Sequence, residues 1–160
     1  MKPLFTTLLA TIGLAATPNV EAAPEDTGWS VRAREERGRP VIVRVRERFP
    51  AVPQAENYVW LTILTCQYSP SPSGLPSADD EALLNELEDA LERHIEQPAI
   101  GIQIATVTGG GKRQWHYYSS DADRFSQAVA KLTRGKTPFR ITTHSEQDPE
   151  RTTFEKLRAQ

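Results

Sequence analysis

The stretch Tyr58–Tyr68, YVWLTILTCQY, decides how the rest of the chain is arranged. Under the two-residue period of a strand its residues fall on two faces, and both faces are apolar: Val59, Leu61 and Ile63 on one, and Tyr58, Trp60, Leu64 and Cys66 on the other. A strand that is apolar on both sides is typical of the interior of a sheet covered on two sides. We therefore expect the other elements to be built around it.

After this strand the pattern alternates between helix and strand. Ser77 is a good N-cap for a helix that runs to Pro98, and its apolar positions recur at helical spacing: Leu83, Leu84, Leu87, Leu91 and Ile95. Two strands joined by three glycines, a second helix, a last strand and a short terminal helix are predicted at 99–108, 112–119, 121–135, 139–144 and 148–157. The order predicts an α+β fold with a ferredoxin-like βαββαβ sheet and two helices on one face.

A β-hairpin is predicted ahead of this unit. Its strands are Trp29–Glu36 and Pro40–Phe49, turned at Arg37-Gly38-Arg39. On the second strand Val41, Val43 and Val45 share one face, so the hairpin is expected to be half buried and to extend or cover the sheet. Pro50 and Pro53 separate it from the strand at Tyr58.

The N-terminus has the pattern of an export signal. Lys2 precedes the apolar run 4–16, and Val20-Glu21-Ala22 offers a cleavage site after Ala22. The run is shorter than the roughly 20 residues that span a membrane. We expect a signal peptide at 1–22, a tail at 23–28 and one domain at 29–160, exported to the periplasm or secreted. An apolar N-terminal helix is the alternative interpretation.

Composition limits the function classes. The chain has 160 residues and a formal net charge of −2, so its overall charge indicates neither a nucleic-acid partner nor an acidic tail. Cys66 is the only cysteine, so no internal disulfide can form. It is interpreted as a small buried hydrophobic residue, with an exposed reactive thiol as the alternative.

Several short motifs occur together in a fixed order. They are the opening tryptophan strand, Gly38-Arg39-Pro40, Leu87-Glu88-Asp89-Ala90-Leu91, Thr106-Val107-Thr108 with Tyr117-Tyr118, and Asp148-Pro149-Glu150. Together they resemble the family catalogued as domain of unknown function 695, over roughly residues 29–158. The resemblance implies a fold related to that of the ribonuclease E inhibitor-like proteins and supplies no catalytic residues. That family usually has an aromatic residue after Asp-Pro-x and another a few residues later, and Arg151 and Phe154 occupy those places here.

The hairpin carries the strongest candidate binding feature. Seven arginines lie between residues 32 and 48, against three glutamates, and arginine forks suit carboxylate and phosphate groups. Five of them are expected to gather on one face: Arg32, Arg34, Arg44, Arg46 and Arg48. Trp115 and Tyr117 form a second candidate patch. One alternative is a sheet edge protected by charge, and another is core packing of the two aromatic residues. A third is a contact with the helix after Ser77, called here the acidic helix because its polar face carries Glu81, Asp89, Glu92 and Glu96.

No motif indicates a catalytic or metal centre. His94, His116 and His144 fall on three different elements without metal-ligand spacing, and Gly109-Gly110-Gly111-Lys112 leads into a strand, whereas a phosphate loop opens a helix. No cofactor, metal or nucleic acid is expected. The sequence favours a non-enzymatic exported module that binds a protein or small anionic partner. The alternative is an enzyme with a site between hairpin and sheet that uses His116, Tyr118 or His144. The oligomeric state is left open.

Overall fold

The structure of the protein, a computed structural model, describes residues 28–160. The signal peptide predicted at 1–22 and the tail predicted at 23–28, except Gly28, lie outside these residues. The elements are, in chain order, β1 Trp29–Glu36, β2 Arg39–Arg46, a 3-10 turn Ala55–Asn57, β3 Trp60–Gln67, α1 Ala78–Leu91, a π-helical turn Glu92–Glu96, β4 Ile102–Gly109, β5 Lys112–Ser119, α2 Ala122–Thr133, β6 Arg140–Gln147 and α3 Thr152–Ala159.

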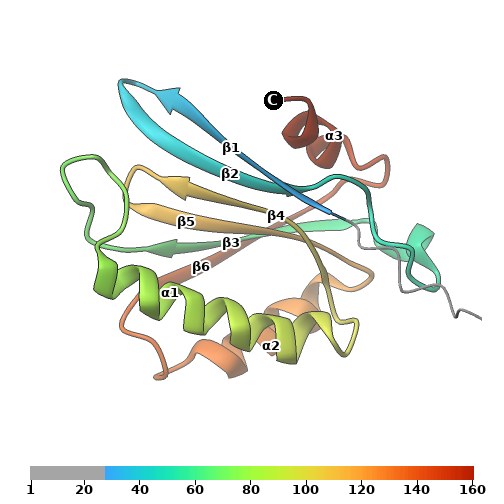
Figure 1. Ribbon diagram of the computed structural model, residues 1–160. Coiled ribbons are helices and arrows are strands. Elements are labelled where there is room, and N and C mark those ends of the chain that lie inside the picture. Colours follow the sequence, from blue (N-terminus) through green and yellow to red (C-terminus); the bar gives the residue numbers. More distant parts are fainter. Residues whose placement is uncertain (1–27) are drawn as a thin grey trace, which may run out of the picture.

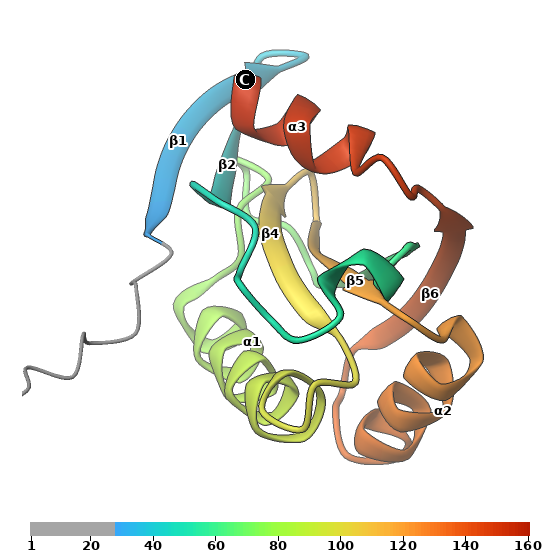
Figure 2. The same ribbon diagram turned by 90° about the vertical axis from the view of Figure 1, so that its right-hand side faces the viewer.

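The strands form one six-stranded sheet in the order β1-β2-β4-β5-β3-β6, and every neighbouring pair is antiparallel. Helices α1 and α2 cover one face, called here the two-helix face, and α3 lies on the other, called the α3 face (Figures 1 and 2). The predicted α+β class is confirmed. As expected, β3 lies inside the sheet, with Leu61, Leu64 and Cys66 fully buried.

Two hydrophobic clusters lie on the two faces of the sheet. The cluster on the two-helix face joins Leu64, Trp115 and Tyr117 to buried residues of both helices. The cluster on the α3 face joins the predicted valine face of β2 to Leu61, Tyr118 and α3. Tyr58 belongs to this second cluster, contrary to prediction, because it precedes β3 and does not follow its alternation.

Local contacts account for the start of α1 and the end of β2. Ser77 caps α1 as predicted, since its Oγ accepts a hydrogen bond from the Asp80 N–H at 3.1 Å. Strand β2 ends at Arg46, earlier than predicted, because the chain leaves the ladder and Phe49 packs edge-on against Tyr118 and Phe154. Leu83 was expected in the core but is 39% exposed, because the buried stripe of α1 is narrower than its run of leucines.

The topology places two hairpin turns side by side. The β1–β2 turn is made by Arg37 and Gly38, both with positive φ, as in a two-residue hairpin turn. The β4–β5 turn is made by Gly110 and Gly111, also with positive φ. Because β2 pairs with β4, both turns lie at the same end of the sheet (Figure 1).

Candidate functional site

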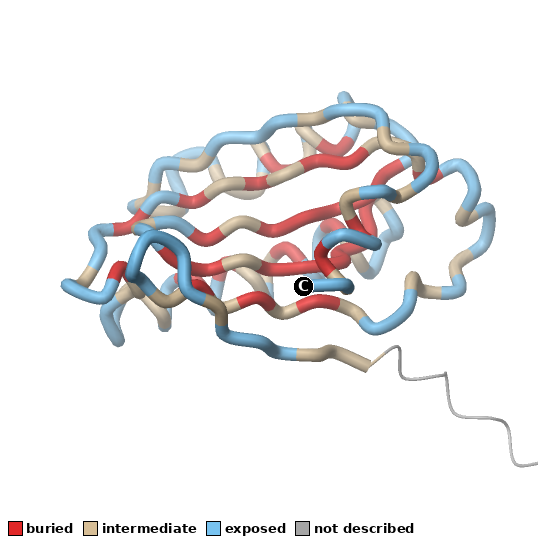
Figure 3. Tube along the Cα trace, turned by 90° about the horizontal axis from the view of Figure 1, so that it is seen from above, coloured by how far each residue is buried: buried red, intermediate tan, exposed pale blue. Residues whose placement is uncertain are grey.

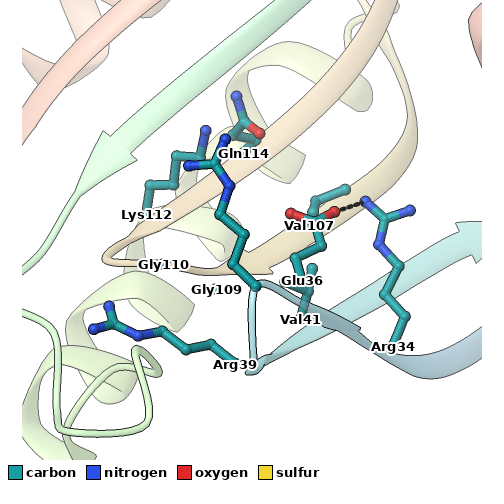
Figure 4. A pocket seen from close by; sticks show the side chains of 10 residues that line it. Arg34, Glu36, Arg39, Val41, Val107, Gly109, Gly110, Lys112 and Gln114 are labelled. Carbon is teal, nitrogen blue, oxygen red and sulfur yellow. Dashed lines mark ion pairs between the residues drawn. The ribbon is translucent and has the colours of Figure 1, made fainter.

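An open hollow of about 690 Å³ lies on the α3 face at this end of the sheet. Its lining comes from the β1–β2 hairpin and the β4–β5 hairpin: Arg34, Glu36, Arg37, Arg39, Val41, Val107, Gly109, Gly110, Lys112 and Gln114. In Figure 4, Lys112 and Gln114 extend from β5, while Arg34 and Glu36 extend from β1. We call this site the basic hollow.

The charges of the basic hollow are unbalanced. Its lining carries four cationic side chains and one carboxylate. Glu36 pairs with Arg34 at 2.6 Å, shown by the dashed line in Figure 4. Arg37, Arg39 and Lys112 have no ion-pair partner among residues 28–160. The hollow therefore has an excess of positive charge available to an anion.

The glycine-rich turn shapes one wall of the hollow. A Cβ on Gly109 would lie 2.9 Å from the Pro40 carbonyl oxygen, so glycine allows β2 and β4 to approach closely here. The Gly111 N–H donates a 3.0 Å hydrogen bond to the Gly74 carbonyl, which ties the turn to the proline- and serine-rich loop after β3. The site is thus held by backbone contacts among three segments.

The predicted gathering of five arginines on one face is wrong. The prediction assumed a three-residue turn, which would place Arg32 opposite Arg44. The turn has two residues, so Glu36 faces Arg39 and Arg32 faces Val43. A shift of one residue moves every side chain of a strand to the other face. Arg32 and Arg34 therefore lie on the α3 face, while Arg44 and Arg46 lie on the two-helix face.

Arg44 and Arg46 contact the acidic helix, an arrangement that the sequence had left open. Arg44 pairs with Glu88 of α1, and Arg46 pairs with Glu96 at 2.5 Å. Both guanidinium groups also lie over the Trp29 ring, at 4.7 and 4.5 Å from its centroid. These contacts join the hairpin to the helix layer, so the two arginines are structural in this conformation.

The remaining predicted arginines are separated from one another. Arg32 donates a 2.7 Å hydrogen bond to the Arg158 carbonyl at the end of α3. Arg48 is exposed and lies beyond the end of β2. Of the five, only Arg34 lines the basic hollow.

Trp115 and Tyr117 do not form a surface patch, because both side chains are fully buried. The Trp115 Nε1–H donates to a Glu88 carboxylate oxygen at 3.0 Å, and Tyr117 packs against Phe125 with ring centroids 5.1 Å apart. The core-packing interpretation is therefore the one that their positions support. Burial also raises the pKa of the Tyr117 hydroxyl far above its ordinary value.

The residues named for the alternative enzyme do not line the basic hollow. His116 is buried on β5, His144 is exposed on β6, and Ile63 of β3 lies between them in register. Burial lowers the pKa of His116 to about 4, so its imidazole is neutral at neutral pH. The Tyr118 hydroxyl donates to Asp148 at 2.6 Å. Within residues 28–160, no group of three or more potential metal ligands is found.

Cys66 has the environment predicted for a buried hydrophobic residue. Its side chain is fully buried, and this burial raises the pKa of the thiol to about 12. Because the thiolate is the nucleophile, the folded protein keeps this cysteine unreactive at neutral pH.

Sequence reasoning named Arg37 and Arg39 only as residues of the hairpin tip and did not identify Lys112 and Gln114. Two facts would have identified these residues as neighbours: each turn has two residues, and β2 pairs with β4. Together these would place Arg39 near Lys112. Adjacency is a long-range property that no local pattern contained.

Comparisons with known proteins support one assignment. No curated protein and no solved structure matches the chain. No helix in the part of the chain described here is long and apolar enough to cross a membrane. A family model described as "Family of unknown function (DUF695)" matches residues 27–157, which is most of the chain. The protein therefore belongs to the DUF695 family of unknown function.

Proposed function

We propose that this protein is an exported, non-enzymatic binding module that recognises a multiply charged anion in the basic hollow. The observation that carries the proposal is a set of three cations, Arg37, Arg39 and Lys112, that surround one open hollow and have no ion-pair partner among residues 28–160. The anion belongs either to a small molecule or to acidic side chains of a partner protein.

The size of the hollow fits a ligand larger than a single carboxylate. Small-molecule sites commonly occupy roughly 300–1,000 Å³, a range that includes the 690 Å³ found here. Arginine forks bind carboxylate and phosphate in a bidentate manner, and lysine adds a point charge. Val41 and Val107 provide an apolar floor for the hollow, and the Gln114 amide can donate and accept hydrogen bonds. Such a lining suits recognition of a di- or trianion with a short apolar or hydrogen-bonding body.

Binding is favoured over catalysis by the character of the lining. Its polar side chains are cations, one amide and Glu36, and that carboxylate pairs with Arg34. A general acid–base site usually depends on a titrating group that is free to reach the substrate. The proposed role therefore uses fixed charge and shape.

We also propose a ferredoxin-like core for the fold and export as the destination of the protein. A ferredoxin-like core, extended by the β1–β2 hairpin, is supported by the strand order β6-β3-β5-β4 and by α1 and α2 on a single face. Export is supported by the charge, apolar run and cleavage pattern of residues 1–22. An exported module would meet its anion outside the cytoplasm.

Titration calorimetry with citrate and with inorganic pyrophosphate tests the proposal. We expect saturable binding to the wild type that weakens as salt is added, because exposed charges are screened. Arg37→Ala, Arg39→Ala and Lys112→Ala should each weaken binding by about tenfold, as expected for a charge-assisted hydrogen bond. The matched control is Arg48→Ala, an exposed arginine outside the hollow, which should bind as the wild type does. Equal loss in all four variants, or no binding of either anion, would contradict the proposal.

A further inference from the structure

Among residues 28–160 no strand pairs with the outer edge of β1, and this free edge is long and regular. All eight residues of β1 pair with β2 without a bulge, and β1 is the outermost strand of the sheet. Figure 3 shows this strand without buried residues along its length. An edge strand with unpaired backbone groups is a template for an incoming strand.

The hydrogen-bond phase of the ladder identifies the residues that face the open edge. The Glu47 N–H donates to the Gly28 carbonyl at 3.0 Å, directly before the first pair of the ladder. Hydrogen-bonded and non-hydrogen-bonded pairs alternate along an antiparallel ladder. The outward N–H and C=O groups therefore belong to the odd-numbered residues Trp29, Val31, Ala33 and Glu35.

The two faces of this edge differ in chemistry. On the α3 face, Arg32 and Arg34 stand beside the position that an added strand would occupy, and Arg34 also lines the basic hollow. On the two-helix face, the corresponding position is flanked by Val31, which is 65% exposed, and by Ala33. Val31 is one of two large hydrophobic residues exposed in residues 28–160. A matching strand would thus have acidic side chains on one face and apolar side chains on the other.

We propose that the partner of the anion site is a protein segment that adds to the free edge of β1 as an extended strand with alternating acidic and apolar residues. The inference rests on the proposed function, since Arg34 belongs to the basic hollow, and it names the chemistry of the partner. Main-chain hydrogen bonds to Val31 and Ala33 supply affinity, and the carboxylates opposite Arg32 and Arg34 supply selectivity. An acidic residue of the partner, just beyond the end of its added strand, reaches Arg37 at the β1–β2 turn.

A second copy of the same chain fits this edge less well. In the two antiparallel β1–β1 registers that use most of the strand, Arg32 of one copy faces Arg32 or Arg34 of the other. Like charges placed directly opposite one another destabilise strand pairing. The same arginines therefore disfavour self-association in these registers and favour an acidic strand.

Hydrogen exchange measured by NMR on the purified protein tests the inference. The probe is a short synthetic peptide that alternates glutamate and valine, and the control peptide alternates lysine and valine. We expect the acidic peptide to slow exchange of the Val31 and Ala33 amides specifically, and the basic peptide to leave them unchanged. Ala33→Pro removes an outward N–H and leaves the β1–β2 ladder intact, because proline is tolerated on the open side of an edge strand. It should weaken peptide binding at least about fivefold.

The outcomes separate this inference from the proposed function. Protection of the Val31 and Ala33 amides in the wild type, with the protection of Val31 lost in Ala33→Pro and citrate binding unchanged in that variant, supports both. Citrate binding without any effect of the acidic peptide on these amides overturns the strand-addition inference and leaves the anion site standing. Peptide binding of equal strength in wild type and Ala33→Pro also overturns it. Failure of citrate, pyrophosphate and peptide alike overturns both proposals.

Discussion

Removal of the Arg46 side chain tests whether the arginines on the two-helix face stabilise the fold or bind a ligand. Arg46 pairs with Glu96, and the two side chains are 15% and 21% exposed. Its Nε–H donates to the Gln103 carbonyl at 2.7 Å, and its guanidinium lies 4.5 Å from the centroid of the Trp29 ring. Arg46→Ala removes all three contacts at once.

The expected cost follows from these contacts. Removal of one partner of a buried ion pair costs about 3–5 kcal/mol, and the residual exposure of both groups places this pair at the lower end. The lost bond to the Gln103 carbonyl is worth about 1 kcal/mol, and the contact with Trp29 about 0.5–1 kcal/mol. Because these contributions overlap at one side chain, we predict that Arg46→Ala lowers the free energy of unfolding by about 3 kcal/mol at pH 7.

The pH dependence of this cost has a definite sign. Burial raises the pKa of Glu96 above its ordinary value of 4.5, although Arg46 opposes the rise. Without Arg46 the pKa of Glu96 rises further. When the pKa of a carboxyl group is higher in the folded state than in the unfolded state, the folded state loses stability as the pH rises from the unfolded pKa through the folded pKa. Below the unfolded pKa this loss is absent. The destabilisation by Arg46→Ala should therefore be smaller at pH 4 than at pH 7.

Urea unfolding followed by tryptophan fluorescence measures this difference at both pH values. Arg48→Ala, an exposed arginine just beyond β2, is the control and should change stability by less than about 0.5 kcal/mol. Citrate binding should be unchanged in folded Arg46→Ala, because Arg46 lies on the face opposite the basic hollow. A loss below about 1 kcal/mol at pH 7, or an equal loss at both pH values, would refute the structural role.

Three further predictions concern single side chains in the core or at its border. The pKa of His116, about 4 when folded, lies below its ordinary value of 6.5, so the unfolded chain binds the proton first as the pH falls. The wild type should lose about 2 kcal/mol from this group between pH 7 and 5, and urea unfolding of His116→Phe should lack that loss. Cys66 should react with Ellman's reagent at pH 8 only when urea unfolds the protein, and immediate reaction of the folded protein would contradict its burial. Asp148 accepts hydrogen bonds from the Tyr118 hydroxyl and from the Thr152 and Thr153 N–H groups. Asp148→Ala should therefore lower the free energy of unfolding by about 2 kcal/mol. An unchanged urea midpoint would show that these hydrogen bonds do not stabilise the fold.

Local patterns in the sequence predicted a large part of the fold. The alternation of Val41, Val43 and Val45 identified the buried face of β2, since a two-residue period is a property of the strand itself. Ser77 identified the start of α1, because a cap acts within one turn of helix. The apolar character of Tyr58–Tyr68 on both faces identified a strand of the sheet interior.

The arginine site was predicted less well for a physical reason. Whether Arg32 shares a face with Arg44 depends on whether the hairpin turn has two residues or three, and Gly38 is compatible with both. The basic hollow depends in addition on the pairing of β2 with β4, which brings Arg39 and Lys112 to one end of the sheet. That pairing arises from burial of the whole sheet between helices, and no short segment specifies it.

An NMR titration with citrate tests most directly whether the basic hollow is an anion site. We predict saturable shifts of backbone amides confined to the two turns, at Arg37, Gly38 and Arg39 and at Gly110 and Lys112, with the helices α1 and α2 unaffected. Shifts that map to the helix layer, or shifts that grow linearly without saturation across the whole surface, would contradict the assignment of this hollow as the binding site.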